Sequence, residues 1–174
     1  MITGVKRTSL SRFTDHRGSF IKTFDADQQK KFGLRGVKEY FFSKSNKNVW
    51  RGMHLQVGQF ASNRLIYCLN GAAIDFLIDL RKNSKSFCSV QSFDLKSDQK
   101  IEGVFVPSGV AHGFLALRDQ TEIHYISDRS HHRDYDSGVN PYSIPEIAKV
   151  LDNTDITIST RDMQLPSLKD FLEN

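Results

Sequence analysis

Two histidines stand in segments that could carry an imidazole into the interior of a folded chain. His112 follows Pro107 and Gly109, which favour a tight turn, and apolar strand-like residues lie on both sides of this segment. His54 lies in the segment Arg51-Gly-Met-His54-Leu-Gln56. Two imidazoles without a further carboxylate are a poor metal-ligand set, because mononuclear sites usually have three or more protein ligands. We therefore expect a barrel without a metal.

A second group of possible ligands is the segment Ser130-His-His-Arg-Asp-Tyr-Asp136. Adjacent side chains in an extended chain point in opposite directions, so His131 and His132 are poorly placed to share one ion. We interpret this segment as a solvated loop rather than a metal site.

Many short β-rich runs must position these residues. Arg64–Leu69 and Ala72–Leu80 flank Asn70-Gly71, which predicts a hairpin with a type I′ turn, because both turn positions need a positive φ. Further strands are expected at Val37–Ser43, Phe87–Leu95, Gly103–Val106, Gly113–Leu117 and Thr121–Ser127. Many strands with few helices indicate an all-β barrel or sandwich.

Helical signals are confined to the margins of the chain. Asp25 is a candidate cap for a short helix over Ala26–Phe32 that stops at Gly33, and Ser143 with Glu146 has the spacing of a capping box that opens Ile144–Leu151. No repeat, linker or low-complexity segment divides the sequence. We expect one domain over residues 1–174.

The composition excludes several classes of protein. With 39% hydrophobic and 25% charged residues, the 174-residue chain is neither a disordered polyelectrolyte nor a membrane span. The net charge is +4, but the basic residues are scattered and form no continuous stripe, so we expect no nucleic-acid partner. No apolar stretch resembles a signal peptide or a membrane helix, so we expect a cytoplasmic protein that binds no membrane.

Five segments together resemble the dTDP-4-dehydrorhamnose 3,5-epimerase family, the metal-free cupins that epimerise nucleotide-linked 4-keto-6-deoxy sugars. In chain order they are Phe13-Thr-Asp-His-Arg17-Gly-Ser-Phe20, Val49-Trp-Arg51-Gly-Met-His54-Leu-Gln56, Asp79-Leu-Arg81-Lys-Asn-Ser84, Val106-Pro-Ser-Gly-Val-Ala-His112-Gly-Phe114 and Ser159-Thr-Arg-Asp162. The Pro-x-Gly-x-x-His element of the fourth segment is similar to the second cupin motif. The resemblance implies a cupin-type jelly-roll β-barrel with short marginal helices.

The resemblance also implies catalytic roles. A hydrogen next to a ketone can be removed when a base contacts it and the developing enolate oxygen is stabilised. By resemblance, His54 is the base and Asp162 is the carboxylate that orients its ring. Arg64 stands where the family usually has a lysine near the C4 oxygen of the sugar, and it keeps the positive charge.

Substrate binding is implied for a further set of residues. Arg17 and Arg51 resemble a diphosphate clamp, a role that suits bidentate guanidinium groups. Phe20 would pack against the nucleotide base, and His112 resembles the second pocket histidine of the family. Gln56 completes the candidate substrate-binding residues. The resemblance implies no metal and no cofactor.

One departure from the family pattern concerns the proton donor. The family has a Thr-x-Tyr-Tyr segment, whereas the aligned residues here are Ser127-Asp-Arg-Ser130 followed by His131 and His132. The usual catalytic tyrosine therefore has no counterpart in this segment. Either His131 or Ser130 donates the proton, Tyr125 or Tyr135 takes the place, solvent acts, or only one centre is inverted. His131 is included among the candidate catalytic residues.

The implied function is epimerisation at C5, C3 or both of a nucleoside-diphosphate 4-keto-6-deoxyhexose, linked to dTDP, CDP or GDP, in deoxysugar biosynthesis. Family members are homodimers in which the N-terminal strand of one subunit, with the equivalents of Arg17 and Phe20, completes the neighbouring pocket. Two alternatives are a 3,4-ketoisomerase, whose typical His-x-His pair is absent here, and a non-catalytic sugar-nucleotide binder.

Overall fold

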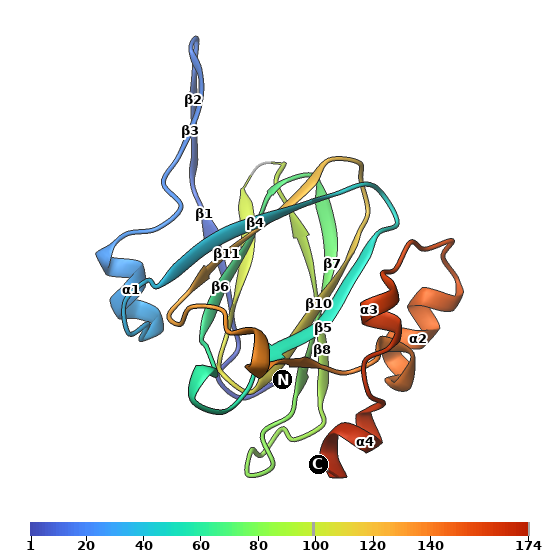
Figure 1. The fold of residues 1–174 in the computed structure, drawn as a ribbon. Coiled ribbons are helices and arrows are strands. Elements are labelled where there is room, and N and C mark those ends of the chain that lie inside the picture. The colour runs from blue at the N-terminus through green and yellow to red at the C-terminus, as the bar shows by residue number, and fades with distance from the viewer. Residues whose placement is uncertain (99, 174) are drawn as a thin grey trace.

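Two five-stranded antiparallel sheets face each other in the computed structural model, which describes residues 1–98 and 100–173 (Figure 1). The first sheet has the order β1-β9-β6-β11-β4, with bounds Lys6–Leu10, Ile101–Val106, Arg64–Asn70, Thr121–Ser127 and Glu39–Ser45. The second has the order β12-β5-β10-β7-β8, with bounds Asp136–Gly138, Trp50–Gln56, Val110–Ala116, Ala72–Asp79 and Val90–Lys96. The predicted all-β architecture with short marginal helices is confirmed.

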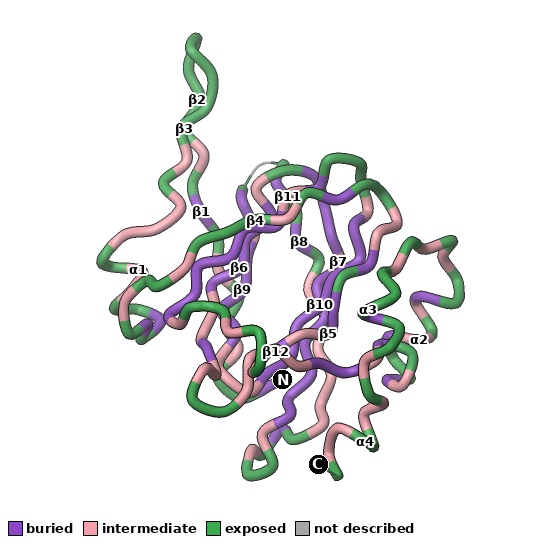
Figure 2. Tube along the Cα trace, in the orientation of Figure 1, coloured by how far each residue is buried: buried purple, intermediate pink, exposed green. Residues whose placement is uncertain are grey.

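A third, two-stranded sheet projects from the body of the molecule (Figure 1). It consists of β2 (Arg12–Asp15) and β3 (Gly18–Ile21), which pair with each other to form a two-stranded sheet. The whole hairpin is exposed or half-buried, in contrast to the central strands (Figure 2).

Apolar side chains form the core in three clusters. One fills the space between the sheets, with Leu77 and Phe114 from the second sheet and Ile66 and Ile123 from the first. Another lies between the second sheet and the C-terminal segment, which contains α2 (Pro145–Asp152), α3 (Thr160–Met163) and α4 (Leu168–Glu173). The last lies beneath α1 (Ala26–Phe32) on the first sheet. Burial of these faces fixes the sheets in one arrangement.

Helix α1 follows the sequence prediction. Asp25 accepts a hydrogen bond from the backbone N–H of Gln28, and Gly33 ends the helix in the left-handed region at φ 66°. The predicted capping box at Ser143 is wrong. Helix α2 begins at Pro145 after Ile144, and the Ser143 hydroxyl instead donates to the carbonyl of Asn140.

The hairpin predicted at Asn70-Gly71 is also wrong. Strands β6 and β7 belong to different sheets, so the turn carries the chain from one sheet to the other. Asn70 does not have the positive φ of a type I′ turn, whereas Gly71 has φ 80°. A Cβ on Gly71 would lie 2.5 Å from the Thr121 hydroxyl, so the close approach of β11 requires glycine.

The remaining predicted strands are present and differ only at their ends. Within the described ranges, no helix has the length and apolar character needed to cross a bilayer.

Candidate active site

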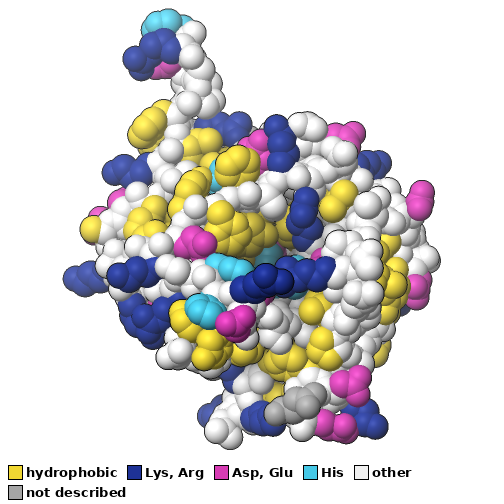
Figure 3. Space-filling view, viewed as in Figure 1, with side chains coloured by type: hydrophobic (Ala, Val, Ile, Leu, Met, Phe, Trp, Pro, Cys, Tyr) yellow, Lys and Arg dark blue, Asp and Glu magenta, His cyan; other side chains and the backbone are white. Residues whose placement is uncertain are grey.

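The inner faces of the two sheets enclose a cavity of about 570 Å³. Its lining comes from β4, β6 and β11 of the first sheet, β5 and β10 of the second, the segment after β11 and the segment around α3. Basic and histidine side chains lie beside apolar ones over this region of the surface (Figure 3). The cavity is therefore large enough, and polar enough, for a sugar linked to charged groups.

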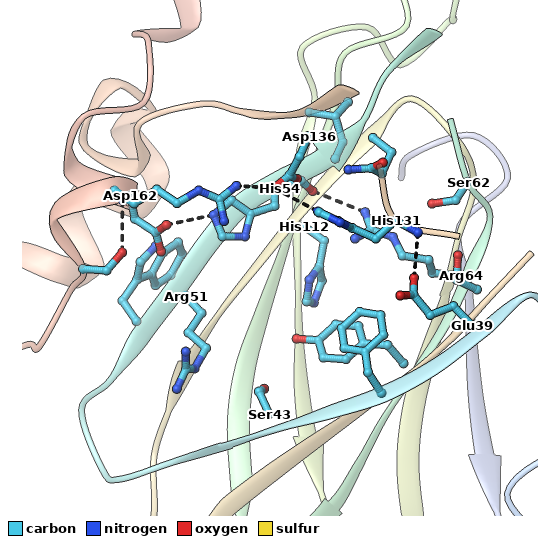
Figure 4. A pocket seen from close by; sticks show the side chains of 18 of the residues that line it. Glu39, Ser43, Arg51, His54, Ser62, Arg64, His112, His131, Asp136 and Asp162 are labelled. Carbon is cyan, nitrogen blue, oxygen red and sulfur yellow. Dashed lines mark hydrogen bonds and ion pairs between the residues drawn. The ribbon is translucent and has the colours of Figure 1, made fainter. Parts of the chain in front are cut away.

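His54 and Asp162 form a hydrogen-bonded pair at the cavity wall (Figure 4). His54 Nε2 lies 2.8 Å from Asp162 Oδ1, and the backbone N–H of Gly52 donates to Asp162 Oδ2 at 3.0 Å. Ser159 caps α3 by accepting from the N–H of Asp162, which fixes the position of the carboxylate. The hydrogen bond expected between these side chains is present.

The charge of Asp162 decides the state of the imidazole. Burial favours the neutral acid, but hydrogen bonds from His54 and from Gly52 N–H outweigh it and hold the pKa of Asp162 below its usual value. An ionised carboxylate only accepts hydrogen bonds, so Nε2 of His54 carries the proton. In neutral His54, Nδ1 is then the basic nitrogen.

A second histidine–carboxylate pair lies behind the first. His112 on β10 is opposite His54 on β5, and its Nε2 lies 2.5 Å from Asp75 Oδ2. His112 is only 4% exposed and Asp75 is fully buried. Sequence analysis placed His112 in the pocket and missed Asp75, although a single acid within the apolar run Ala72–Ile78 was an available signal.

The facing wall presents Arg64 and Tyr125 from the first sheet. Arg64 donates to the backbone carbonyl of His54 at 3.3 Å, and its Nε is buried without a partner in the described part of the chain. Burial lowers the pKa of Arg64, opposed by the nearby Tyr125 and Asp75, and a guanidinium stays charged at neutral pH. Arg64 thus supplies a cation inside the cavity.

Tyr125, one of the proton donors that the sequence left open, lines the cavity. Its ring stacks on Phe41 with centroids 4.6 Å apart and meets the edge of His112 at 5.7 Å. Burial, then the charge of Asp75, raises the pKa of Tyr125. The hydroxyl therefore keeps its proton at neutral pH and can donate it. The segment 127–130 contains no tyrosine, but Tyr125 lies only two residues before it.

The other candidates for the proton donor are separated by their positions. His131 lines the cavity, is 52% exposed at the side chain and lies 3.3 Å from Asp136, which also pairs with Arg161. Tyr135 packs on Phe60 and His132 and, like Ser130, is not part of the cavity lining.

The segment after β11 joins the two sheets at one end of the cavity. The backbone N–H of His131 donates to Glu39 on β4 (Figure 4), and the N–H of His132 donates to Gln56 on β5. Gln56 therefore lies in the cavity, as expected, and anchors this segment as well. Glu39 was not singled out by sequence, because nothing local marks the first residue of an edge strand as functional.

The two arginines expected at the diphosphate lie in different places. Arg51 is exposed, lines the cavity and donates to the Ser45 hydroxyl at 3.0 Å. Arg17 lies at the tip of the β2–β3 hairpin, where it pairs with Asp15, and its side chain is 80% exposed. Phe20 on the same hairpin is 62% exposed. Neither Arg17 nor Phe20 lines the cavity of its own chain.

The histidines and carboxylates of the cavity are arranged in pairs. Across residues 1–98 and 100–173, no three His, Cys, Asp or Glu side chains are grouped as metal ligands. His54 and His112 each use one nitrogen on a separate carboxylate.

Comparisons with known proteins establish the family of the chain. A family model described as dTDP-4-dehydrorhamnose 3,5-epimerase matches residues 1–170. The dTDP-4-dehydrorhamnose 3,5-epimerase of Escherichia coli (strain K12) is 37% identical over 131 residues, which cover 73% of this chain and 69% of that protein.

Two solved structures share the fold and confirm the cupin-type jelly roll. A dTDP-4-dehydrorhamnose 3,5-epimerase from Bacillus anthracis is 31% identical, with a TM-score of 0.83 over 94% of each chain. A 4-keto-6-deoxy sugar epimerase from Streptomyces spheroides is 26% identical, with a TM-score of 0.87 over 99% of this chain and 86% of that one. The chain belongs to the dTDP-4-dehydrorhamnose 3,5-epimerase family, and it is an epimerase of the isomerase class.

Proposed function

We propose that the cavity binds a dTDP-linked 4-keto-6-deoxyhexose and that His54 begins its epimerisation. The observation that carries this proposal is the ionised Asp162 holding the His54 imidazole at the cavity wall, with Arg64 and Tyr125 on the facing sheet. The related structure from Bacillus anthracis holds TDP and pyrophosphate, which supports a thymidine nucleotide here.

The reaction needs one base, one acid and a cation. Nδ1 of His54 removes the hydrogen from C5 or C3, and the electron pair of that C–H bond forms the enolate with the charge on the C4 oxygen. Arg64 stabilises this oxyanion, and Asp162 stabilises the imidazolium that forms. A proton delivered to the opposite face of the same carbon inverts the centre. His54 then releases its proton to solvent, and the acid that donated its proton to carbon regains one from solvent.

Tyr125 is the donor that we favour for that opposite face. It projects from the first sheet, whereas His54 belongs to the second, and its buried hydroxyl stays protonated. His131 is the second candidate, because it lines the cavity with a carboxylate beside it. Its exposure favours a position near the entrance, close to the more polar parts of the substrate.

Nucleotide binding would use both the cavity and a neighbouring protomer. We propose that Arg51, His112 and Gln56 contact the substrate from the chain that carries His54. Arg17 and Phe20 would reach the cavity of a partner in a homodimer, because their hairpin projects away from the body of its own chain (Figure 1). The exposed aromatic side chains of this hairpin support such a contact.

The test is proton NMR in deuterated water with dTDP-, CDP- and GDP-linked 4-keto-6-deoxy sugars. We expect deuterium at C3, C5 or both of the dTDP sugar, and no exchange with His54→Asn, whose affinity for dTDP stays unchanged. His132→Asn is the matched control, because His132 lies outside the cavity lining. A shifted carbonyl would establish a ketoisomerase instead, and binding without exchange in the wild type would establish a binding protein.

A further inference from the structure

Three nitrogen donors lie buried in the cavity lining without a hydrogen-bond partner among the described residues. They are Nε of Arg64, Nε of Arg129 and Nε2 of Gln56. Buried polar groups in native proteins are nearly always satisfied, so three in one cavity call for a specific explanation. A ligand that carries several acceptor oxygens would satisfy them.

Strand register brings these donors to the same end of the cavity. Ser127 ends β11, where it pairs with Arg64 on one side and with Glu39 on the other. Arg129 follows Ser127 by two residues. Gln56 ends β5 in the facing sheet and joins the His131–His132 segment through the N–H of His132. The donors therefore come from both walls where the segment after β11 closes the cavity.

The backbone of Arg129 is fixed on both sides. Ser127 Oγ donates to the carbonyl of Arg129 at 2.7 Å and accepts from its N–H at 3.3 Å. The preceding Asp128 is fully buried and accepts from the backbone and side chain of Asn63 and from Arg35. None of these contacts uses the Arg129 side chain, so the backbone is fixed while the guanidinium remains available to a ligand.

The Arg129 guanidinium also forms no ion pair with the described residues. In the described part of the chain, no carboxylate lies within ion-pair distance of its guanidinium. Arg51 is exposed, and Arg161 is half-exposed and pairs with Asp136. Those outer arginines suit a diphosphate that leads toward solvent. The inner pair, Arg64 and Arg129, is then left for the sugar.

We propose that Arg129 is a further substrate-binding residue, which with Arg64 forms a cradle of two guanidinium groups around the ketone oxygen of the sugar and its enolate. This inference rests on the proposed epimerase reaction and adds to it. The enolate at C4 is common to proton removal from C3 and from C5, so a cation beside that oxygen assists both steps equally. Gln56 adds a neutral donor to the same group.

The test uses Arg129→Met, which keeps an unbranched apolar stem but removes the charged guanidinium, and Arg129→Lys, which restores the charge. With Arg129→Met we expect kcat and deuterium exchange at C3 and C5 to fall together by about 10²-fold, the loss typical of one oxyanion donor. Affinity for dTDP should not change, and Arg129→Lys should recover part of the rate. Arg133→Met is the control, because Arg133 is an exposed arginine of the same segment outside the cavity lining.

Three results would overturn the proposal. One is wild-type kcat in Arg129→Met. Another is weaker dTDP binding with unchanged kcat, which would make Arg129 a diphosphate ligand. The third is a wild-type enzyme that exchanges neither hydrogen, in which case the epimerase assignment itself fails. If the wild type exchanges hydrogen but Arg129→Met does not behave as expected, only the role of Arg129 is refuted. The epimerase function is refuted only if the wild type itself shows no exchange. Circular dichroism checks that each variant is folded.

Discussion

Asp162 and Tyr125 show how one cavity holds two acids in opposite protonation states. Burial raises the pKa of both groups, but hydrogen bonds from His54 and Gly52 reverse its effect on Asp162. Ser43, Arg64 and Arg51 lower the pKa of Tyr125, but they do so by less than burial raises it. The result is a carboxylate that supports a base on one wall and a protonated hydroxyl on the other, which is the separation of acid and base that epimerisation needs.

Replacing Tyr125 with Phe should separate exchange from inversion. His54 can still remove a proton and return deuterium to the same face, so slow exchange should remain while inversion falls by about 10²–10⁴-fold. The ring stacked on Phe41 is kept, so the fold should be unaffected. The measurement compares deuterium uptake with product configuration by NMR.

Tyr135→Phe is the matched control for that variant, since Tyr135 packs on Phe60 outside the cavity. Unchanged inversion in Tyr125→Phe would remove Tyr125 as the donor. His131→Asn would then become the variant to examine, because His131 lines the cavity and is the second candidate donor.

The sequence predicted the cavity residues that lie in compact motifs, left Tyr125 as one of several alternatives, and missed Asp75, which strand register brings beside His112. His54 and His112 stand next to turn-forming or glycine-containing segments that mark them locally. Asp75 and Tyr125 lie in the middle of ordinary strands, and only the pairing of β10 with β7 and of β11 with β4 turns them toward the histidines. Long-range register has no local signature in a single sequence.

At the scale of elements, local chemistry predicted helix ends better than strand partners. Asp25 and Gly33 act on the backbone of α1 itself, so the sequence was sufficient there. The chain turns at Asn70-Gly71 as expected. Strand β7 nevertheless joins the second sheet, because the choice of sheet depends on how the two faces of β7 are buried. The Ser143 hydroxyl does not cap α2, because it donates to the carbonyl of Asn140 and accepts from the N–H of Leu168, a residue far along the chain.

The connection between β7 and β8 depends on one buried carboxylate. Asp79 accepts hydrogen bonds from Arg81 and from the hydroxyls of Ser84 and Ser86. Ser86 also accepts from the N–H of Thr3, which ties the N-terminal segment to this loop. Burial raises the pKa of Asp79, but the hydrogen bonds outweigh it and hold that pKa well below its usual range.

Asp79→Asn should therefore destabilise the protein by about 3 kcal/mol at pH 7, because Arg81 loses its partner. A carboxyl with a lowered pKa in the folded state contributes stability above its unfolded pKa of about 4, and this contribution is lost as the pH falls below it. The difference in free energy of unfolding between wild type and variant should shrink below pH 4. Urea denaturation at fixed protein concentration measures it.

Asp94→Asn provides the comparison for Asp79→Asn. Asp94 is exposed on β8, so its replacement should change the free energy of unfolding little at any pH. A constant difference between Asp79→Asn and wild type from pH 7 to pH 3 would contradict the role assigned to the Asp79 charge.

At the scale of the whole molecule, the β2–β3 hairpin is the feature that a single chain does not explain. Phe13 and Phe20 are both exposed on it, and among the described residues Arg17 at its tip forms an ion pair only with Asp15 of the same hairpin. The family resemblance implies that Arg17 and Phe20 belong to the site, whereas they do not line the cavity of their own chain. The homodimer that we propose would account for this difference, because in a symmetric dimer each hairpin would lie against the other chain.

Mixing two inactive variants should test this exchange. Arg17→Ala/Phe20→Ala has a damaged hairpin and an intact His54, and His54→Asn has the reverse. If each hairpin serves the neighbouring cavity, a mixed dimer has one site with both an intact His54 and an intact hairpin, and one site with neither. Random reassociation of equal amounts then restores activity at about one quarter of the sites. If the hairpin serves its own chain, every site in the mixture keeps one defect, and exchange measured by NMR stays at the level of the separate variants.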